Sequence, residues 1–437
     1  MKITVTAITK EINGKTSGDL RKKINKAING LRLYTSKRKA KELFQPIITG
    51  FKIFSGKQAA ICYAEDNYTD ARIQNDEKAL KRFEQIIPTL HHSIADYVNI
   101  TLLIEGIPKI LAMLLNSLGQ YATSEKSGRY TKMKGRSKKE KQAYEKWLEI
   151  FKNLIEKEYP AIDEKTRMKL SMENARYMLS VFTPTTMSYT TSLRQYNYII
   201  DWLDRFCMNV SDKSGLFAKK LVSPMKELRD AIEFLYVDGL RDMKNRSFSF
   251  LANETNSPSV DAKENFGGET YTVRYNSSFA ALAQAQRHRT LSYKMCLNEN
   301  PTTLDDAFYI PPILFENEYA KNMGLAKMWL EDLSSMWTLF PQATLVNVIE
   351  SGEVEKFFLK CQERICGRAQ LEIARQTRDT YYKIAANADN YGESLKALIQ
   401  SFEITAGSEK RIKAKCECLS CKEPCRWGAK NATTRKI

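Results

Sequence analysis

The chain has 437 residues, of which 43% are hydrophobic, so it holds enough apolar side chains for about two or three buried cores. Its 68 lysines and arginines against 51 aspartates and glutamates give a net charge of +17. This charge favours an anionic partner, but it does not choose among nucleic acid, nucleotide phosphates and a membrane surface. Disorder is not the expected state of such a composition, and with only 19 glycines and recurrent helical periodicity we expect more helix than strand.

The first residues contain no basic segment followed by an apolar one, which argues against a secretion signal. The most apolar stretch, residues 100–118, is interrupted by Glu105, Pro108 and Lys109, so it does not resemble a membrane span. We therefore expect a soluble cytoplasmic protein with no membrane partner. The three histidines nearly exclude a histidine-rich metal site, and the scattered cysteines are expected to be reduced thiols.

The first half of the chain alternates predicted strands and helices. Residues 96–104 predict a strand, and Pro108 opens a helix with apolar residues at spacings of three and four. A basic loop over 124–141 precedes an amphipathic helix over 143–157 and a second helix that ends near Leu179. A break at 183–186 then leads to a helix through 196–206.

The same order returns after a polar stretch. Residues 245–268 are rich in Asn, Ser, Pro and Gly and predict a linker. A strand at 269–276, a helix at 278–286, a basic cluster and a helix at 319–339 follow, then a break at Pro341 and a helix from Val354. Because this order repeats that of the first half, we interpret the chain as an internal duplication.

Three basic segments carry the clearest chemistry. Arg287-His288-Arg289 presents two guanidinium groups around one imidazole, which suits phosphate or carboxylate oxygens, although a solvated basic turn is the plainer interpretation. Ser127-Gly128-Arg129-Tyr130 offers a hydroxyl, a closely approaching backbone and a guanidinium, as an anion pocket requires. Arg176 stands in an apolar helix, where a cation is costly unless it meets an anion.

These segments resemble the flavin-dependent thymidylate synthases, whose hallmark is R-H-R-x-x-S followed by S-x-R-Y. Neither half keeps the complete motif. The first half keeps S-x-R-Y at 127–130 but has Ser117-Leu118-Gly119 where R-H-R belongs, whereas the second keeps Arg287-His288-Arg289 and Ser292 but has lost S-x-R-Y at 297–300. Arg176 and Arg194 survive only in the first half, and Arg364 with the family's A-Q-x-E-I at 369–373 survives only in the second.

The resemblance implies an α/β, helix-rich fold made of two fused copies of that enzyme domain. The first copy is expected over 1–244, the linker over 245–268, the second copy over 269–407 and a basic cysteine-containing tail over 408–437. Because the losses are complementary, one composite site per chain is expected. A homodimer would then reproduce the four-domain assembly of the family.

The resemblance also assigns roles residue by residue. Arg129, Arg287 and Arg364 are expected to act in catalysis. The expected FAD-binding residues, with His92 matching the family more loosely than the rest, are Arg287, His288, Arg289, Ser292, Arg194 and His92. The expected dUMP-binding residues are Gln284, Arg287, Glu125, Ser127, Gly128, Arg129, Arg176 and Arg364.

The implied activity is the reductive methylation of dUMP to dTMP, with FAD as the cofactor and methylenetetrahydrofolate and NADPH as co-substrates. In this family the flavin supplies the electronic chemistry and the protein supplies geometry and charge. Two alternatives stay open. One is a related dUMP-modifying enzyme such as a hydroxymethylase, and the other is a non-catalytic nucleic-acid-binding or scaffold protein that descended from such an enzyme.

The tail contains a separate signal, four cysteines within ten residues at Cys416, Cys418, Cys421 and Cys425. Four thiols in polar surroundings predict a tetrahedral zinc site, with an iron–sulfur cluster as the second choice. Free thiols in a disordered tail are the plainer interpretation. The basic residues around this knuckle and Trp427 also permit contact with nucleic acid.

Overall fold

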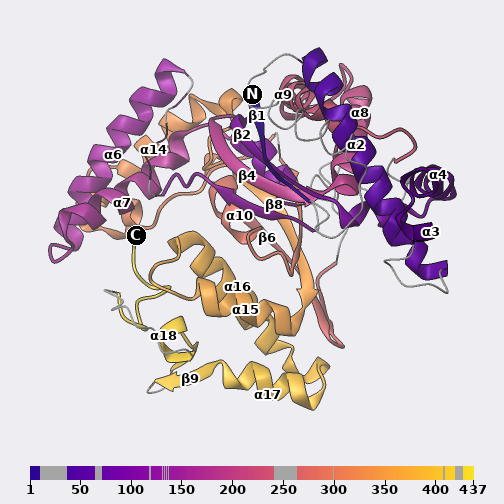
Figure 1. Ribbon diagram of the computed structural model, residues 1–437. Coiled ribbons are helices and arrows are strands. Elements are labelled where there is room, and N and C mark those ends of the chain that lie inside the picture. The colour runs from indigo at the N-terminus through magenta and orange to yellow at the C-terminus, as the bar shows by residue number, and fades with distance from the viewer. Residues whose placement is uncertain are drawn as a thin grey trace. The chain divides into compact units, whose positions relative to one another are not determined.

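The computed structural model describes residues 1–9, 37–63, 71–117, 120–129, 131, 133, 135, 137–240, 263–298, 300–406, 409–418 and 427–437. The chain divides into two compact units, each of which contains a four-stranded antiparallel sheet and helices. The first unit comprises Met1–Lys126 and Pro184–Phe248, and the second comprises Ser127–Thr183 and Ser249–Ile437. The expected mixture of helices and strands is confirmed, and Figure 1 shows both sheets and their helices.

The sheet of the first unit has the strand order β1-β2-β4-β3. Its central strand β2 buries every second side chain, with Ile100 and Leu102 at 0% exposure, as expected for a sheet with one covered face. Helix α8 packs an apolar face inward and is followed by α9. The elements are β1 Lys2–Ile8, α2 Lys37–Ala60, η1 Ile61–Tyr63, α3 Ala71–Gln74, α4 Asp76–Ile86, η2 Ile87–Thr89, η3 His92–Tyr97, β2 Asn99–Pro108, α5 Lys109–Leu115, β3 Ala122–Glu125, β4 Pro184–Ser192, α8 Leu193–Asn209, α9 Leu216–Ile232 and η5 Glu233–Leu235.

The sheet of the second unit has the strand order β5-β6-β8-β7. Its elements from the first half of the sequence are α6 Lys138–Glu158, α7 Glu164–Ala175 and η4 Arg176–Met178. Those from the second half are β5 Asn265–Gly267, β6 Thr270–Ser278, α10 Phe279–Ala285, β7 Ser292–Leu297, α11 Leu304–Ala307, α12 Ile313–Glu316, α13 Glu318–Asn322, α14 Leu325–Ser334, η6 Trp337–Leu339, β8 Leu345–Glu353, α15 Val354–Arg364, α16 Leu371–Ala386, η7 Ala388–Asn390, α17 Glu393–Ser401, β9 Glu403–Ala406, β10 Glu409–Ile412 and α18 Lys415–Cys418.

The α6–α7 hairpin of the first half packs against α14 of the second half, and Figure 1 shows these helices side by side. Trp147 and Trp329, both at 0% exposure, meet edge to face with their ring centroids 4.8 Å apart. Phe151 lies 5.5 Å from Trp329, and the indole nitrogen of Trp147 donates to Asp332 over 2.7 Å. An aromatic core therefore joins segments that lie far apart in the sequence.

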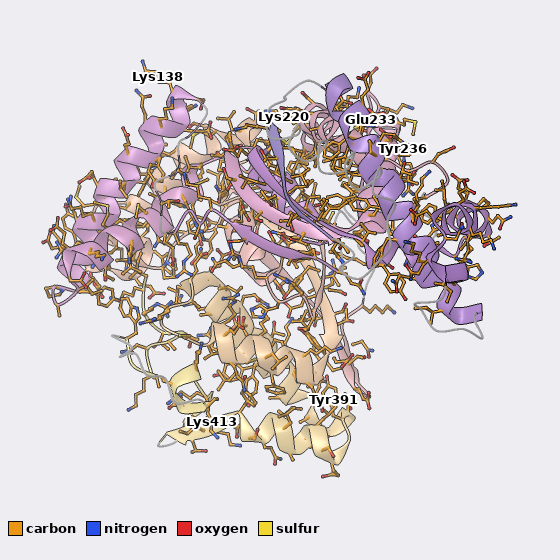
Figure 2. The ribbon with its side chains drawn as sticks, viewed as in Figure 1. Lys138, Lys220, Glu233, Tyr236, Tyr391 and Lys413 are labelled. Atoms are coloured by element: carbon orange, nitrogen blue, oxygen red, sulfur yellow. The ribbon has the colours of Figure 1, made fainter. Side chains whose placement is uncertain are left out.

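Helix α6 begins with a complete capping box. The Ser137 hydroxyl accepts a hydrogen bond from the Glu140 peptide nitrogen, and the Glu140 carboxylate accepts one from the Ser137 peptide nitrogen. Figure 2 shows Lys138, in the first turn, with its side chain directed away from the ribbon. Glu140 also accepts a hydrogen bond from the Ser180 peptide nitrogen over 3.0 Å, so one buried carboxylate fixes both ends of the segment that contains Arg176.

Most predicted elements are present, but several have other bounds, and others in the structure were not predicted. The strand predicted at 96–104 begins at Asn99 and continues to Pro108, because residues 92–97 form a 3₁₀ helix. The helix predicted over 319–339 is divided, since Gly324 has a φ of +61° and separates α13 from α14. Strands β4 and β8 were not predicted, although their β-branched residues favour strands; β4 begins at Pro184, and β8 follows Pro341.

The two sheets share an order of elements. In the first unit β2 leads directly into the seven-residue helix α5, and β4 leads into the longer helix α8. In the second unit β6 leads directly into the seven-residue helix α10, and β8 leads into the longer helix α15. The duplication stays a prediction, which this repeated order supports. Of the predicted linker, residues 245–262 lie outside the described residues and Asn265–Gly267 forms β5.

Among the described residues, no helix combines the length and apolar content that crossing a lipid bilayer requires.

Candidate active site

The Arg287-His288-Arg289 segment forms a tight turn directly after α10. Ser278 caps this helix by accepting a hydrogen bond from Ala281, and the peptide nitrogen of His288 donates to Ala285 over 3.0 Å. The turn leaves Arg287 and Arg289 exposed, whereas His288 is only 7% exposed. Ser292 is exposed at the start of β7. Two guanidinium groups can therefore reach a ligand at the surface while the imidazole stays beneath them.

Burial, together with the positive charges of Arg364 and Lys360, lowers the pKa of His288 to about 2. Lys360 belongs to a fully buried ion pair with Glu350, whose carboxylate also accepts hydrogen bonds from Tyr271 and Tyr275. His288 is consequently a neutral imidazole at physiological pH. Its Nε2 lies 3.7 Å from a Glu363 oxygen, too far for a hydrogen bond.

The Ser127-Gly128-Arg129 segment belongs to the second unit as well. The Ser127 hydroxyl accepts a hydrogen bond from the Arg129 peptide nitrogen over 3.3 Å. Arg129 binds Glu173 through Nε and donates through Nη2 to the main-chain oxygen of Arg368 over 2.5 Å. A side chain at Gly128 would lie 3.2 Å from Met133 and 3.5 Å from Arg176, so glycine lets this turn approach Arg176 closely.

Arg176 follows α7 and is 7% exposed. Its Nη2 donates to Oε1 of Gln370, and that oxygen also accepts a hydrogen bond from Nε2 of Gln284. Burial lowers the pKa of Arg176, and the charge of Arg129 acts in the same direction, whereas Glu173 opposes the shift. The Gln370 side chain therefore holds Arg176, from the first half of the sequence, next to Gln284, from the second half.

Arg364 ends α15, and its Nη2 donates to the main-chain oxygen of Gln284 over 3.4 Å. Burial lowers the pKa of Arg364, and the positive charges of Arg129 and Arg287 contribute to the same shift. The structure thus brings together four of the arginines expected to bind the nucleotide, all in the second unit: Arg129, Arg176, Arg287 and Arg364.

Several buried polar atoms of this cluster make no hydrogen bond in the described part of the chain. They are Nε of Arg176, Oε1 of Gln284, Nε2 of His288 and Nε of Arg364. A buried donor or acceptor without a partner costs about 1 to 3 kcal/mol, so native proteins rarely retain several in one place without a ligand or water to satisfy them. The cluster therefore has the donors and the acceptor of a binding site for a polar, anionic molecule.

Gln370 and Glu372 belong to this cluster, although the sequence assigned them no role. Glu372 accepts hydrogen bonds from the hydroxyl of Tyr177 over 2.6 Å and from the peptide nitrogen of Ser278 over 2.7 Å. Gln370 binds the Tyr177 hydroxyl and Arg176. The A-Q-x-E-I motif at 369–373 could have pointed to both residues. Their contacts, however, are with Arg176 and Tyr177, which lie 194 and 195 positions away in the sequence, and the spacing within a motif does not reveal such contacts.

Three expected site residues lie in the first unit instead. Arg194 donates to Asp96 over 2.6 Å and to the Tyr198 hydroxyl over 2.8 Å, and Nδ1 of His92 lies 3.2 Å from the same hydroxyl. These residues form a polar group of their own. Glu125, the last residue of β3, binds Lys109 over 2.6 Å.

The cysteine knuckle is only partly described. Cys416 and Cys418 lie in α18, where Cys416 is exposed, while Cys421 and Cys425 lie outside the described residues. In the part of the chain that the structure describes, no three His, Cys, Asp or Glu side chains form a group that could hold a metal ion.

Comparison with known proteins agrees with the resemblance over part of the chain. The model of the family described as thymidylate synthase complementing protein matches residues 55–206, about a third of the sequence. No curated protein shows a significant match.

Among solved structures, thymidylate synthase X from Helicobacter pylori with FAD and dUMP is 12% identical, with a TM-score of 0.27, over 55% of this chain and 95% of that one. A UMP/dUMP methylase from Streptomyces cacaoi is 13% identical, with a TM-score of 0.27, over 44% of this chain and 92% of that one. Scores of this size describe a partial likeness only.

Proposed function

We propose that the protein is a flavin-dependent enzyme that methylates dUMP reductively to dTMP, using methylenetetrahydrofolate and NADPH. The observation that carries the proposal is a group of buried polar atoms on Arg176, Gln284, His288 and Arg364 that make no hydrogen bond to any described residue and lie beside Arg129 and Arg287. The family match over residues 55–206 supports the same class of reaction.

The charges of the cluster fit a nucleotide monophosphate. Burial disfavours the charged forms of Arg176 and of the largely buried Arg364, and a phosphate would supply both a negative charge and several acceptor oxygens. Oε1 of Gln284 accepts no hydrogen bond from the residues that the structure describes, so it is available to the N3–H group of a uracil ring. In this proposal arginine side chains neutralise the phosphate and polarise the uracil carbonyl groups, which stabilises charge that develops on the ring.

The residues of the Arg287–Arg289 turn fit a flavin nucleotide. His288 has a buried Nε2 without a hydrogen bond in the described residues, and the exposed guanidinium groups beside it suit the diphosphate of FAD. The flavin, when bound, supplies the hydride that completes the methyl group. Arg289 and Ser292 contribute to this binding, and Arg287 contacts both molecules. Arg194 and His92 stay proposed flavin contacts from the family resemblance alone.

The activity can be tested by supplying FAD, methylenetetrahydrofolate and NADPH and measuring tritium release from dUMP labelled at C5. We expect release that requires all three, with dTMP as the product identified by mass. A hydroxymethylated nucleotide would support the alternative enzyme. A colourless protein that neither binds FAD nor releases tritium would contradict the proposal and favour a nucleic-acid-binding or scaffold role, which the basic tail allows.

The tandem architecture is part of the proposal. Two diverged copies of one enzyme domain would contribute complementary motifs to one site, and two chains would form a homodimer. The repeated order of elements in the two sheets supports this interpretation.

Zinc binding by the tail is a separate proposal. Cys416, Cys418, Cys421 and Cys425 would hold one zinc ion per chain. Elemental analysis of protein purified without chelator should find about one equivalent, and Cys418→Ser should lose it while flavin stays bound. Less than half an equivalent of zinc in the wild type would contradict the zinc site. Absorption bands of an iron–sulfur cluster would instead show that the same cysteines bind iron.

A further inference from the structure

Residues 427–437 fold back into the second unit and are anchored there. Ile437 is 3% exposed within the core of this unit, and Arg435 is 5% exposed. The peptide nitrogen of Ile313 donates to the main-chain oxygen of Lys436 over 2.9 Å, and the peptide nitrogen of Lys436 donates to the Tyr159 hydroxyl over 3.0 Å. The segment therefore connects the end of α6 with the start of α12, and Figure 1 shows the C-terminal end of the chain beside the α6–α7 hairpin.

Arg435 extends from this segment to the loop of residues 365–370, which we call the site loop. Its Nη2 donates to the main-chain oxygen of Ala369 over 2.6 Å, and its Nε donates to that of Ile437 over 2.7 Å. Arg375 holds the segment in turn by donating to the main-chain oxygens of Thr433 over 3.1 Å and Arg435 over 2.9 Å. A buried guanidinium with donors directed at main-chain oxygens fixes the backbone on both of its sides.

The site loop contains the groups that align the candidate nucleotide site. Arg129 donates to the oxygen of Arg368, and Gln370 binds both Arg176 and Gln284. At the other end of the loop, the oxygen of Ile365 accepts a hydrogen bond from the peptide nitrogen of Lys415 over 2.8 Å. The path of this loop therefore decides where the arginines of the first half lie.

We infer that Arg435 is a positioning residue for the candidate nucleotide site: by holding Ala369 it fixes Gln370, which orients Arg176 and Gln284. The nucleotide as ligand rests on the proposed function, whereas the order of the site loop does not. Residues beyond the thymidylate-synthase-like region would thus complete the site without touching its ligand.

The test compares Arg435→Gln with the wild type by hydrogen exchange of the site loop and by calorimetric titration of dUMP. Losing charge-assisted hydrogen bonds should accelerate exchange at residues 365–370 and weaken dUMP binding about tenfold. FAD affinity should stay unchanged, because the Arg287–Arg289 turn lies outside the loop. Arg435→Lys should recover part of the dUMP affinity, since it keeps the charge but not the fork of donors.

Lys436→Gln is the matched control, because it removes one charge from the same segment. Its partner is Glu158, its side chain is 32% exposed, and neither measured quantity should change. If Arg435→Gln does not fold, Arg375→Gln should produce the same localised acceleration in the site loop.

Unchanged exchange in residues 365–370 of a folded Arg435→Gln or Arg375→Gln protein would overturn the inference, as would full dUMP affinity in that protein. A wild type that binds no dUMP would instead contradict the proposed function, and hydrogen exchange would still decide whether Arg435 orders the loop.

Discussion

A buried arginine destabilises a protein unless its charge and its donors are matched, and Arg176 shows this conflict clearly. It is 7% exposed, its Nη2 is satisfied by a neutral amide, and its Nε is unsatisfied among the described residues. The sequence indicated this residue because a cation stood in apolar surroundings. Gln370 and Glu372 gave no such signal, since an amide and a carboxylate at the start of a helix look like ordinary capping residues.

Replacing Arg176 by methionine should separate stability from binding. We expect Arg176→Met to leave the free energy of unfolding unchanged or to raise it by about 1 kcal/mol, because methionine removes the desolvation cost of a buried charge whose hydrogen-bond partner is a neutral amide. dUMP affinity should fall by more than about tenfold. Denaturant unfolding and calorimetry measure the two effects, and a large loss of stability with intact dUMP affinity would contradict the assignment.

The imidazole of His288 should resist protonation in the folded protein. Its pKa is lowered to about 2, whereas an unfolded histidine titrates near its usual value of about 6.5. Between these values the unfolded state binds the additional proton, so the stability contributed by neutral His288 is present above about pH 6.5 and decreases as the pH falls below it.

Proton-detected NMR of the histidine rings can test this, because the chain has only three histidines and His288→Gln identifies one of them. We expect the His288 signals to stay at their neutral positions from pH 8 to pH 5, an interval that spans the usual pKa of about 6.5. A titration midpoint of the His288 signals between pH 6 and pH 7 would show that burial and the charges of Arg364 and Lys360 do not lower the pKa of this histidine.

At the scale of elements, periodicity predicted the long amphipathic helices well and the strands less completely. Helices α6 and α8 were both predicted, α6 from its apolar face, whereas β4 and β8 were missed because Pro184 and Pro341 were interpreted only as breaks. The partner of each apolar face could not be predicted, because periodicity shows that a helix face is buried but not against what. The packing of α6 on α14 is such a case.

Trp147 should be a main source of stability for this pair of helices. Trp147→Ala removes a fully buried side chain that contacts Trp329 and Phe151 and donates to Asp332, so the second unit should lose about 3 to 5 kcal/mol of unfolding free energy. Met208→Ala is the control, since Met208 is 73% exposed in the first unit and should change stability by less than about 0.5 kcal/mol. Equal effects of the two substitutions in denaturant unfolding would contradict the role of the aromatic core.

At the scale of the whole molecule, the compact units differ from the two copies expected in the sequence. Residues 127–183, which the sequence assigns to the expected first copy, belong to the same compact unit as the expected second copy. The order of elements in the sequence does not reveal where residues 127–183 pack, because their packing depends on which hydrophobic faces come into contact. The complementary losses predict one composite site, which stays a prediction; in its favour, the surviving S-x-R segment and Arg176 lie in the same unit as Arg287, His288 and Arg364.

The central claim is that each chain holds one nucleotide site, assembled within the second unit from residues of both copies. The most direct measurement is a calorimetric titration of dUMP into the wild type, Arg129→Ala, Arg287→Ala and a complex of these two variants isolated through different tags. We predict one site per wild-type chain and none in either variant or in their complex, because every working site needs both arginines from one chain. Two sites per wild-type chain, binding by either single variant, or binding restored in the mixed complex would contradict the claim.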